Sequence, residues 1–346
     1  MSDDAVSDNG ALEAVPPRAL AARGAAWTLQ RGPRRWRRYS PWMFYAFVSP
    51  WLLGFLALTA IPMFYALGMS FTNFDGLSGH WHWVGFANYN KAWHDQHFWS
   101  GLRTTAVYGV VTVPLSLAGG LGLAVLVNRR LRAVGVFRTI FYLPSVIPVV
   151  ATTLMFKLLF DRNTGLLNTV LSWFGVGAVG WLSDPWAFKI MVLLALWGLG
   201  GGMVIFLAGL QGIPAELLEA ATVDGAGAWQ RFRRITLPIL SPVVFFQFVF
   251  ATIASLQTVV QPLLLSPAVN SGAGGGFTDP THVQAGDYLY MVHVYAQFFD
   301  YQQYGYGAAL LWILFVVILV ITAAILRSSS FWVYYEVEQD GKAGRR

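Results

Sequence analysis

Histidine and acidic side chains gather in one stretch of the chain, and these residue types bind divalent metal ions. The members of this stretch are His80, His82, His94, Asp95 and His97. Two of the histidines alternate with tryptophans, which are typical of the membrane–water interface. No cysteine is present to add a thiolate ligand. We therefore interpret the stretch as an interfacial loop and predict no metal site.

Motifs for catalysis are absent from the sequence. The only Gly-Lys pair, Gly341-Lys342, is followed by Ala343, so there is no phosphate-binding loop of the form G-x-x-x-x-G-K-[ST]. Neither H-E-x-x-H nor G-x-S-x-G occurs. We predict that the chain is not an enzyme and binds no cofactor itself.

Polar side chains recur within an otherwise apolar stretch over residues 237–262. At about 100° per residue, Gln247, Thr258 and Gln261 fall within an arc of roughly 60° on a helix, flanked by Ser255 and Gln257. Polar groups facing lipid are costly, so this stripe is predicted to face the protein interior. There it either lines a path for a neutral polar solute or forms hydrogen bonds between helices, and the sequence leaves both open.

Two further features lie inside apolar stretches. Lys157 is a charged residue within the predicted span 139–160, and we interpret it as snorkelling to the interface near Asp161. The glycines of 198–202 are interpreted as close helix packing, whereas Trp197 either stacks on a sugar or packs against a neighbour.

The chain has too few charged residues to cover the surface of a water-soluble fold. Only 12% of the 346 residues are charged and 56% are hydrophobic, with a mean hydropathy of +0.52. Soluble domains carry about 25% charged residues. Six apolar stretches with at most one charged residue each are long enough to cross a bilayer, near 42–70, 104–128, 139–160, 187–211, 237–262 and 307–327. The chain is therefore predicted to be an all-α membrane protein, a bundle of six transmembrane helices.

Basic residues set the orientation of these spans, because cytoplasmic loops carry an excess of Lys and Arg. Most arginines lie before the first span, after the second, after the fourth and after the last. We predict that both termini are cytoplasmic, with a disordered basic arm over 1–40, a transmembrane domain over 41–327 and a tail over 328–346. The net charge of +6 then reflects topology, and no nucleic-acid partner is expected.

One further stretch, 163–183, is free of charge but is interrupted by Asn, Ser and four glycines. We interpret residues 166–174 within it as an amphipathic helix lying at the membrane interface. A seventh span here would place the basic residues on both sides of the membrane.

The loop between the fourth and fifth spans, 212–238, has the pattern of two short helices. Pro214 suits the first turn of a helix, and Glu216 and Glu219 favour its positive N-terminal end. Gly225 can adopt a positive φ and end that helix, after which Trp229 begins a second one. From physics alone, the loop is either a connector or a segment that projects to meet a partner.

The same loop resembles the EAA loop of ABC importer permeases, which reads E-A-A-x-x-x-G followed about nine residues later by I-x-L-P. The matching residues are Glu219, Ala220, Ala221, Gly225, Ile235, Leu237 and Pro238. Asp224, Trp229 and Pro242 extend the match toward the carbohydrate importers, and shorter matches follow in order from Ser40 to Arg327.

This resemblance implies the type I importer permease fold and a permease subunit in a prokaryotic cytoplasmic (inner) membrane. Its implied partners are a second permease, a dimer of ABC ATPases that holds ATP and Mg²⁺, and an extracytoplasmic sugar-binding protein. The implied ATPase-coupling residues are Glu219, Ala220, Ala221, Asp224, Gly225 and Ala226.

The sequence departs from that branch where substrate is expected to pass. The fifth span has Leu256 to Gln261 (LQTVVQ), where relatives often have F-Q-x-F-D-Q, and the segment 263–286 is longer and richer in glycine than usual. An importer for a phosphorylated polyol such as glycerol 3-phosphate, or a stand-alone secondary transporter, remain the alternatives.

Overall fold

The computed structural model describes residues 41–77, 79, 81–129, 133–266, 283 and 286–334. The predicted disordered arm over 1–40 and the tail beyond residue 334 lie outside this part of the chain. The described residues form α-helices and two π-helical turns, with one antiparallel bridge between Thr72 and Trp83. The chain divides into two units, Met1–Pro62 and Met63–Arg346.

The first apolar helix begins in the first unit. α2 (Pro41–Phe55) leads into a π-helical turn, η1 (Leu56–Ala60), and α3 (Ile61–Ser70) continues the helix. Pro62 cannot donate a backbone hydrogen bond, and the wider π turn lies directly before it. The resulting helix, Trp42–Ser70, is long and apolar enough to cross a membrane, which confirms the predicted first span over 42–70.

Five further segments can cross a membrane, three of them without a sharp bend. These three are α5 (Gln96–Val127), α16 (Tyr304–Trp332) and the run of α12 (Ala228–Arg231), η2 (Phe232–Thr236) and α13 (Leu237–Leu256). The other two are bent pairs of helices, α6 (Val134–Val146) with α7 (Val149–Leu159) at 95°, and α9 (Ala187–Trp197) with α10 (Gly200–Gln211) at 43°. Counting each pair as one span gives six.

The third span is not the straight helix predicted over 139–160. The chain bends by 95° at Ile147, whose backbone is extended (φ −70°, ψ 133°). The residue before a proline avoids the helical region because its backbone clashes with the proline ring, and Pro148 follows Ile147. The sequence therefore contained the signal for this break.

The fifth span ends earlier than the predicted residue 262. α13 stops at Leu256, and the chain becomes helical again only in α14 (Val260–Leu265). Pro262 has no amide hydrogen for the carbonyl four residues before it, and its ring would clash with that carbonyl in a continuous helix. The predicted polar stripe of one helix is therefore wrong beyond Leu256.

The last span is longer than the predicted 307–327. α16 runs from Tyr304 to Trp332, so the first residues of the predicted tail over 328–346 are helical. Beyond this helix, the backbone amide of Tyr334 donates to Ser241 Oγ over 2.8 Å, which attaches the end of the described chain to α13. The second span also begins earlier than predicted, because Asp95 caps α5 by accepting from the His97 amide.

Short helices connect these spans. They are α4 (Ala87–His94), α8 (Leu166–Trp173), α11 (Ala215–Val223) and α15 (Tyr290–Phe299). The predicted amphipathic helix is α8, and Asn168 anchors it by accepting from Trp181 Nε1 over 2.9 Å and donating to the Val179 carbonyl.

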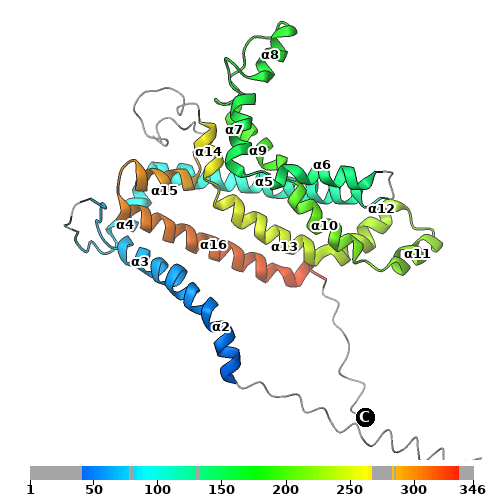
Figure 1. The fold of residues 1–346 in the computed structure, drawn as a ribbon, viewed down its shortest axis with the longest axis horizontal. Helices are drawn as coiled ribbons and strands as arrows, with labels where there is room; N and C mark the ends of the chain where they lie inside the picture. Colours follow the sequence, from blue (N-terminus) through cyan, green and yellow to red (C-terminus); the bar gives the residue numbers. More distant parts are fainter. Residues whose placement is uncertain are drawn as a thin grey trace, which may run out of the picture. The chain divides into compact units, whose positions relative to one another are not determined.

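Within the second unit, α5 is the central helix, and it packs against α9, α10, α13 and α15 (Figure 1). Its 32 residues extend for about 48 Å. At its Val127 end, a buried cluster joins it to Phe206 and Leu240. At its Gln96 end, Phe98 packs with Tyr290 and Leu310. We call these the α11 end and the α15 end of the unit.

Candidate functional site

The loop between α10 and α13 forms the predicted pair of short helices at the α11 end. Pro214 caps α11 at its N-terminus, and α12 begins at Ala228 and leads through η2 into α13. Leu218 faces inward and packs on the cluster that contains Leu210 and Ile213. This anchor positions α11 against the ends of the membrane helices.

The turn after α11 has the geometry expected from its glycine. Gly225 adopts φ +79°, in the left-handed region that glycine enters without strain. The amides of Gly225 and Ala226 donate to the carbonyls of Thr222 and Ala221 over 3.1 and 2.9 Å, which satisfies carbonyls at the helix end. The structure thus places all six predicted coupling residues in the last turns of α11 and the turn that follows.

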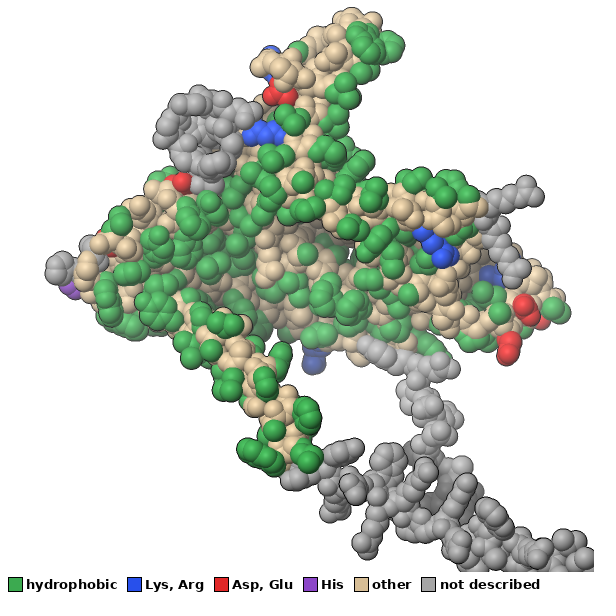
Figure 2. Space-filling model, viewed as in Figure 1, with side chains coloured by type: hydrophobic (Ala, Val, Ile, Leu, Met, Phe, Trp, Pro, Cys, Tyr) green, Lys and Arg blue, Asp and Glu red, His purple; other side chains and the backbone are tan. Residues whose placement is uncertain are grey.

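These residues form an exposed surface. Glu219, Ala220, Asp224 and Gly225 are exposed, and Ala221 and Ala226 are half-buried. Acidic side chains are visible at the α11 end in Figure 2. Val223, which the sequence reasoning did not single out, is 88% exposed at the tip of α11. Single exposed apolar side chains are common on protein surfaces, so Val223 alone does not mark a docking site.

The second helix of the loop adds aromatic side chains to this surface. The ring of Trp229 is 71% exposed and stacks on Phe232, with ring centroids 5.7 Å apart. Arg231 donates to the hydroxyl of Thr222, which itself donates to the Leu218 carbonyl over 2.7 Å. A side-chain hydrogen bond therefore joins the two short helices to each other.

The predicted path residues are divided between three elements. Gln247 in α13 faces α10, because a Cβ at Gly202 would lie 3.0 Å from its Nε2. Ser255 is buried against Gly109 of α5. Gln257 and Thr258 lie in the break between α13 and α14, and Gln261 lies in α14. The contacts of Gln247 and Ser255 favour packing between helices over a role in lining one translocation path.

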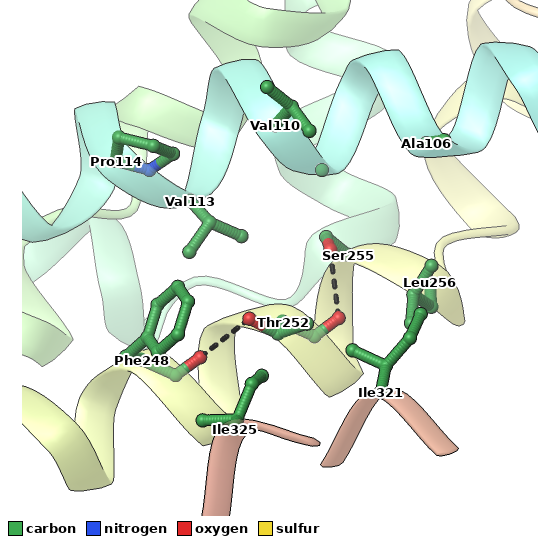
Figure 3. A pocket seen from close by; sticks show the side chains of 11 residues that line it. Ala106, Val110, Val113, Pro114, Phe248, Thr252, Ser255, Leu256, Ile321 and Ile325 are labelled. Atoms are coloured by element: carbon green, nitrogen blue, oxygen red, sulfur yellow. Dashed lines mark hydrogen bonds between the residues drawn. The ribbon is translucent and has the colours of Figure 1, made fainter. Parts of the chain in front are cut away.

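A cavity of about 420 Å³ lies beside Ser255, between α5, α13 and α16 (Figure 3). Its walls are apolar side chains such as Val113, Phe248 and Ile321. The hydroxyls of Thr252 and Ser255 donate to carbonyls of their own helix over 2.7 and 2.8 Å. This cavity therefore presents few polar groups and is poorly suited to a polyol.

Close packing explains Gly200 of the fourth span. A Cβ at Gly200 would overlap the carbonyl oxygen of Phe141 in α6, so only glycine permits this approach of α10 to α6. The packing interpretation is confirmed at this position. Trp197 contacts the edge of Phe156, with ring centroids 5.7 Å apart.

Lys157 does not snorkel to the surface as predicted. Its side chain is only 6% exposed, and Nζ donates to the carbonyl of Ser266 over 2.9 Å. The amine therefore links α7 to the end of α14 instead of reaching water. The two residues are 109 positions apart, and nothing in the local sequence indicated their contact.

The histidine stretch is dispersed between two elements. His94 lies at the end of α4, where its Nδ1 is 2.8 Å from the Asn90 carbonyl, and His97 lies in the first turn of α5. His80 is outside the described residues. In the part of the chain that the structure describes, no three His, Cys, Asp or Glu side chains are placed to share a metal ion.

Comparison with known proteins gives consistent results over most of the chain. Residues 116–334 match the family described as binding-protein-dependent transport system inner membrane component. The probable ABC transporter permease protein YesP of Bacillus subtilis is 38% identical over 300 residues, covering 86% of this chain and 93% of YesP. The trehalose/maltose transport system permease protein MalF of Thermococcus litoralis is 33% identical, covering 72% of this chain and 80% of its own.

Solved structures show the same fold. A permease chain from a bacterial ABC transporter for the acidic polysaccharide alginate superposes with a TM-score of 0.70 at 24% identity, covering 84% of this chain and 95% of that one. The family match covers well over half of this chain, and the relatives are permease subunits. The chain belongs to the family of inner membrane components of binding-protein-dependent transport systems.

Proposed function

We propose that this chain is the permease subunit of an ATP-driven importer that carries a sugar or oligosaccharide across the cytoplasmic membrane of a prokaryote. The observation that carries the proposal is the exposed surface of α11 and its following turn, built from the residues that match the coupling motif. Such a surface gives a separate ATPase a place to dock.

The nature of the substrate is supported by the relatives. Permeases named for lactose in Rhizobium radiobacter and for arabinooligosaccharides in Bacillus subtilis are 33% and 31% identical, over 67% and 82% of this chain. A phosphorylated polyol would need cations along its path, and the buried amine of Lys157 is already bonded to the Ser266 carbonyl. These points favour a sugar or oligosaccharide over a phosphorylated polyol.

The proposed complex contains a second permease, two ATPase subunits that bind ATP and Mg²⁺, and an extracytoplasmic sugar-binding protein. One related solved transporter is in complex with a periplasmic protein bound to an alginate pentasaccharide. Both chain termini and the α11–α12 loop would then lie in the cytoplasm, and the α15 end would face outward.

In this mechanism the chain performs no bond chemistry. ATP binding closes the ATPase dimer, and the dimer moves α11 and α12 as one piece because Arg231 and Thr222 join them. The η2 turn is continuous with α13, so this motion reaches the membrane helices directly. Hydrolysis in the ATPase resets the cycle.

The test is uptake into vesicles that hold the reconstituted complex. We expect uptake of a labelled sugar that requires ATP inside the vesicle together with the binding protein outside it. ATPase stimulation by the binding protein across a panel of mono- and oligosaccharides would identify the substrate. Uptake of none of these sugars, or uptake that proceeds without ATP, would overturn the proposal.

A further inference from the structure

A small polar cavity lies at the α15 end of the second unit, where α4, α5, α15 and α16 meet. Its volume is about 200 Å³. Polar and apolar atoms contribute nearly equally to its lining, in contrast to the apolar cavity beside Ser255. The residues that line this cavity belong neither to the exposed surface of α11 and its following turn nor to the predicted translocation path.

Buried polar side chains form the floor of this cavity. His293 is 1% exposed and Gln297 is 6% exposed. The Nδ1 of His293 is 2.8 Å from the hydroxyl of Tyr288, and its Nε2 is 3.3 Å from Asp95 Oδ2. That Nε2 completes no hydrogen bond, although buried polar atoms are nearly always bonded. This nitrogen is enclosed and faces the Asp95 carboxylate, so the floor offers a ligand the polar groups around it, from Asp95, Tyr288 and Gln297.

The groups on the floor are held in fixed positions. Tyr306 donates to Asp95 Oδ2 over 2.8 Å, and the Asp95 side chain also accepts from the His97 amide. Burial lowers the pKa of His293 to about 4, against a smaller opposing effect of Asp95, so the ring is neutral at pH 7. Groups fixed in this way need little reordering when a ligand binds.

Exposed side chains form the rim. The amine of Lys91 lies over the ring of Tyr306, 4.1 Å from its centroid, and donates to Gln303 Oε1. His97 and Tyr301 complete the rim. The turn that carries Gln303 is closed by a hydrogen bond of 2.7 Å from its amide to the Gln297 carbonyl, after a positive φ of 54° at Gln302.

These groups match the chemistry of a small polyol. Amide, imidazole and phenol groups both donate and accept hydrogen bonds, and the aromatic rings offer flat faces. The positive charge of Lys91 and the negative charge of Asp95 lie in one cavity and offset each other, so the site favours a neutral ligand. Sites for drug-sized ligands are about 300–1,000 Å³, and this smaller cavity admits a single ring.

We propose that the cavity between α4, α5, α15 and α16 binds one neutral sugar ring at the outer entrance of the permease. The inference rests on the proposed function, because it assumes that sugars reach this side of the chain. The cavity would hold the terminal ring of a substrate that has left the binding protein, before the ring enters the membrane helices.

The test measures sugar binding directly, with the full-length chain and its partner permease in nanodiscs, without ATP or binding protein. The probes are glucose, galactose, mannose, xylose and arabinose, observed by saturation-transfer NMR, with glucuronate and inorganic phosphate as charged comparators. We expect saturable binding of at least one neutral sugar. We also expect His97→Ala and Gln303→Ala to weaken it about tenfold, the loss expected for one hydrogen bond.

His94→Ala is the matched control, because it removes an exposed histidine three residues from His97 that does not line the cavity. Absence of saturable binding by all the neutral sugars, stronger binding of glucuronate or phosphate, or binding that both rim variants leave unchanged would overturn the inference. If uptake depends on ATP and a sugar but no sugar binds in this cavity, the sugar-binding role of the cavity is rejected and the proposed function stands. Sugar binding here without such uptake would reject the proposed function alone.

Discussion

The side-chain amine of Lys157, in α7, donates to the backbone carbonyl of Ser266, at the end of α14, over 2.9 Å. This bond joins the bent third span to the short helix that follows the break in the fifth. α14 packs on α7 along most of its length and carries Gln261, one of the predicted path residues. Lys157 therefore positions α14, the short helix that follows the break in the fifth span.

Lys157→Met should loosen α14 while preserving most of the packing of the long side chain. Removing one partner of a buried hydrogen bond costs about 1–3 kcal/mol. We expect a lower melting temperature of the purified permease in detergent, together with reduced uptake. Lys189→Met is the control, since Lys189 is exposed above the ring of Trp186. Equal melting temperatures for the two variants would show that the Lys157 bond contributes little.

Gly225→Ala should disturb the turn after α11. An L-residue at φ +79° costs about 1–2 kcal/mol, and this strain falls on the residues that match the coupling motif. We expect weaker co-purification of the ATPase and slower uptake, with normal membrane insertion. The control is Gly227→Ala, since Gly227 has φ −66° and a Cβ there meets no atom within 4 Å. If both variants retained the ATPase equally, the conformation of the turn would not matter for coupling.

Glu219→Lys tests the charge of the proposed docking surface. The side chain is exposed, so the substitution leaves the core untouched and changes what a partner meets. We expect loss of ATPase association at physiological ionic strength, measured by co-purification, and loss of uptake. Glu216→Lys provides the comparison, because it reverses an exposed carboxylate one turn earlier on α11. Transport that survives Glu219→Lys would remove Glu219 from the coupling role.

Gly200→Ala should disrupt the approach of α10 to α6. The added methyl group overlaps the carbonyl oxygen of Phe141, and backbone cannot move aside as a flexible side chain can. Overpacking of this kind costs about 1–3 kcal/mol. In thermal unfolding in detergent, Gly200→Ala should clearly lower the melting temperature. Gly198→Ala should lower it little, because a Cβ at Gly198 would lie no closer than 3.7 Å to its nearest neighbour. The reverse order would contradict the packing role assigned to Gly200.

The sequence predicted the apolar segments and the turn at Gly225 because both depend on local patterns. Absence of charge over 20 residues marks a span, and a glycine after an alanine-rich helix marks its end. The breaks at Pro148 and Pro262 carried local signals too, since proline disrupts a helix at a known position. A search for uncharged stretches alone does not detect these breaks.

Contacts between distant residues were not predictable in this way. Nothing near Lys157 indicates Ser266, and Asp95 meets His293 only because α15 packs across the start of α5. In a membrane protein a polar residue can face lipid headgroups, a cavity or another helix, and its position along the chain does not distinguish these. The polar stripe predicted over 237–262 failed for both reasons, because Pro262 interrupts the helix and because Gln247 and Ser255 contact glycines of neighbouring helices.

Two buried titratable groups at the α15 end should affect stability with opposite dependence on pH. The pKa of His293 is lowered by burial to about 4, whereas that of Asp287 is raised to about 7 by burial and by the negative charge of Asp184. Between pH 4 and 6.5 the unfolded histidine binds a proton that the folded one lacks, so this contribution to stability increases with pH. Over the same range the folded aspartate keeps a proton that the unfolded one loses, so its contribution decreases with pH.

The two effects largely cancel in the native protein between pH 4 and 6.5, and single substitutions should separate them. Asp287→Asn leaves the histidine, so the melting temperature should rise from pH 4.5 to 6.5, by the equivalent of about 1.4 kcal/mol per pH unit. His293→Gln leaves the aspartate, so the melting temperature should fall over the same interval. The measurement is thermal unfolding of the full-length chain in detergent at matched ionic strength. Parallel pH profiles for the two variants would show that neither group is desolvated as its position in the fold implies.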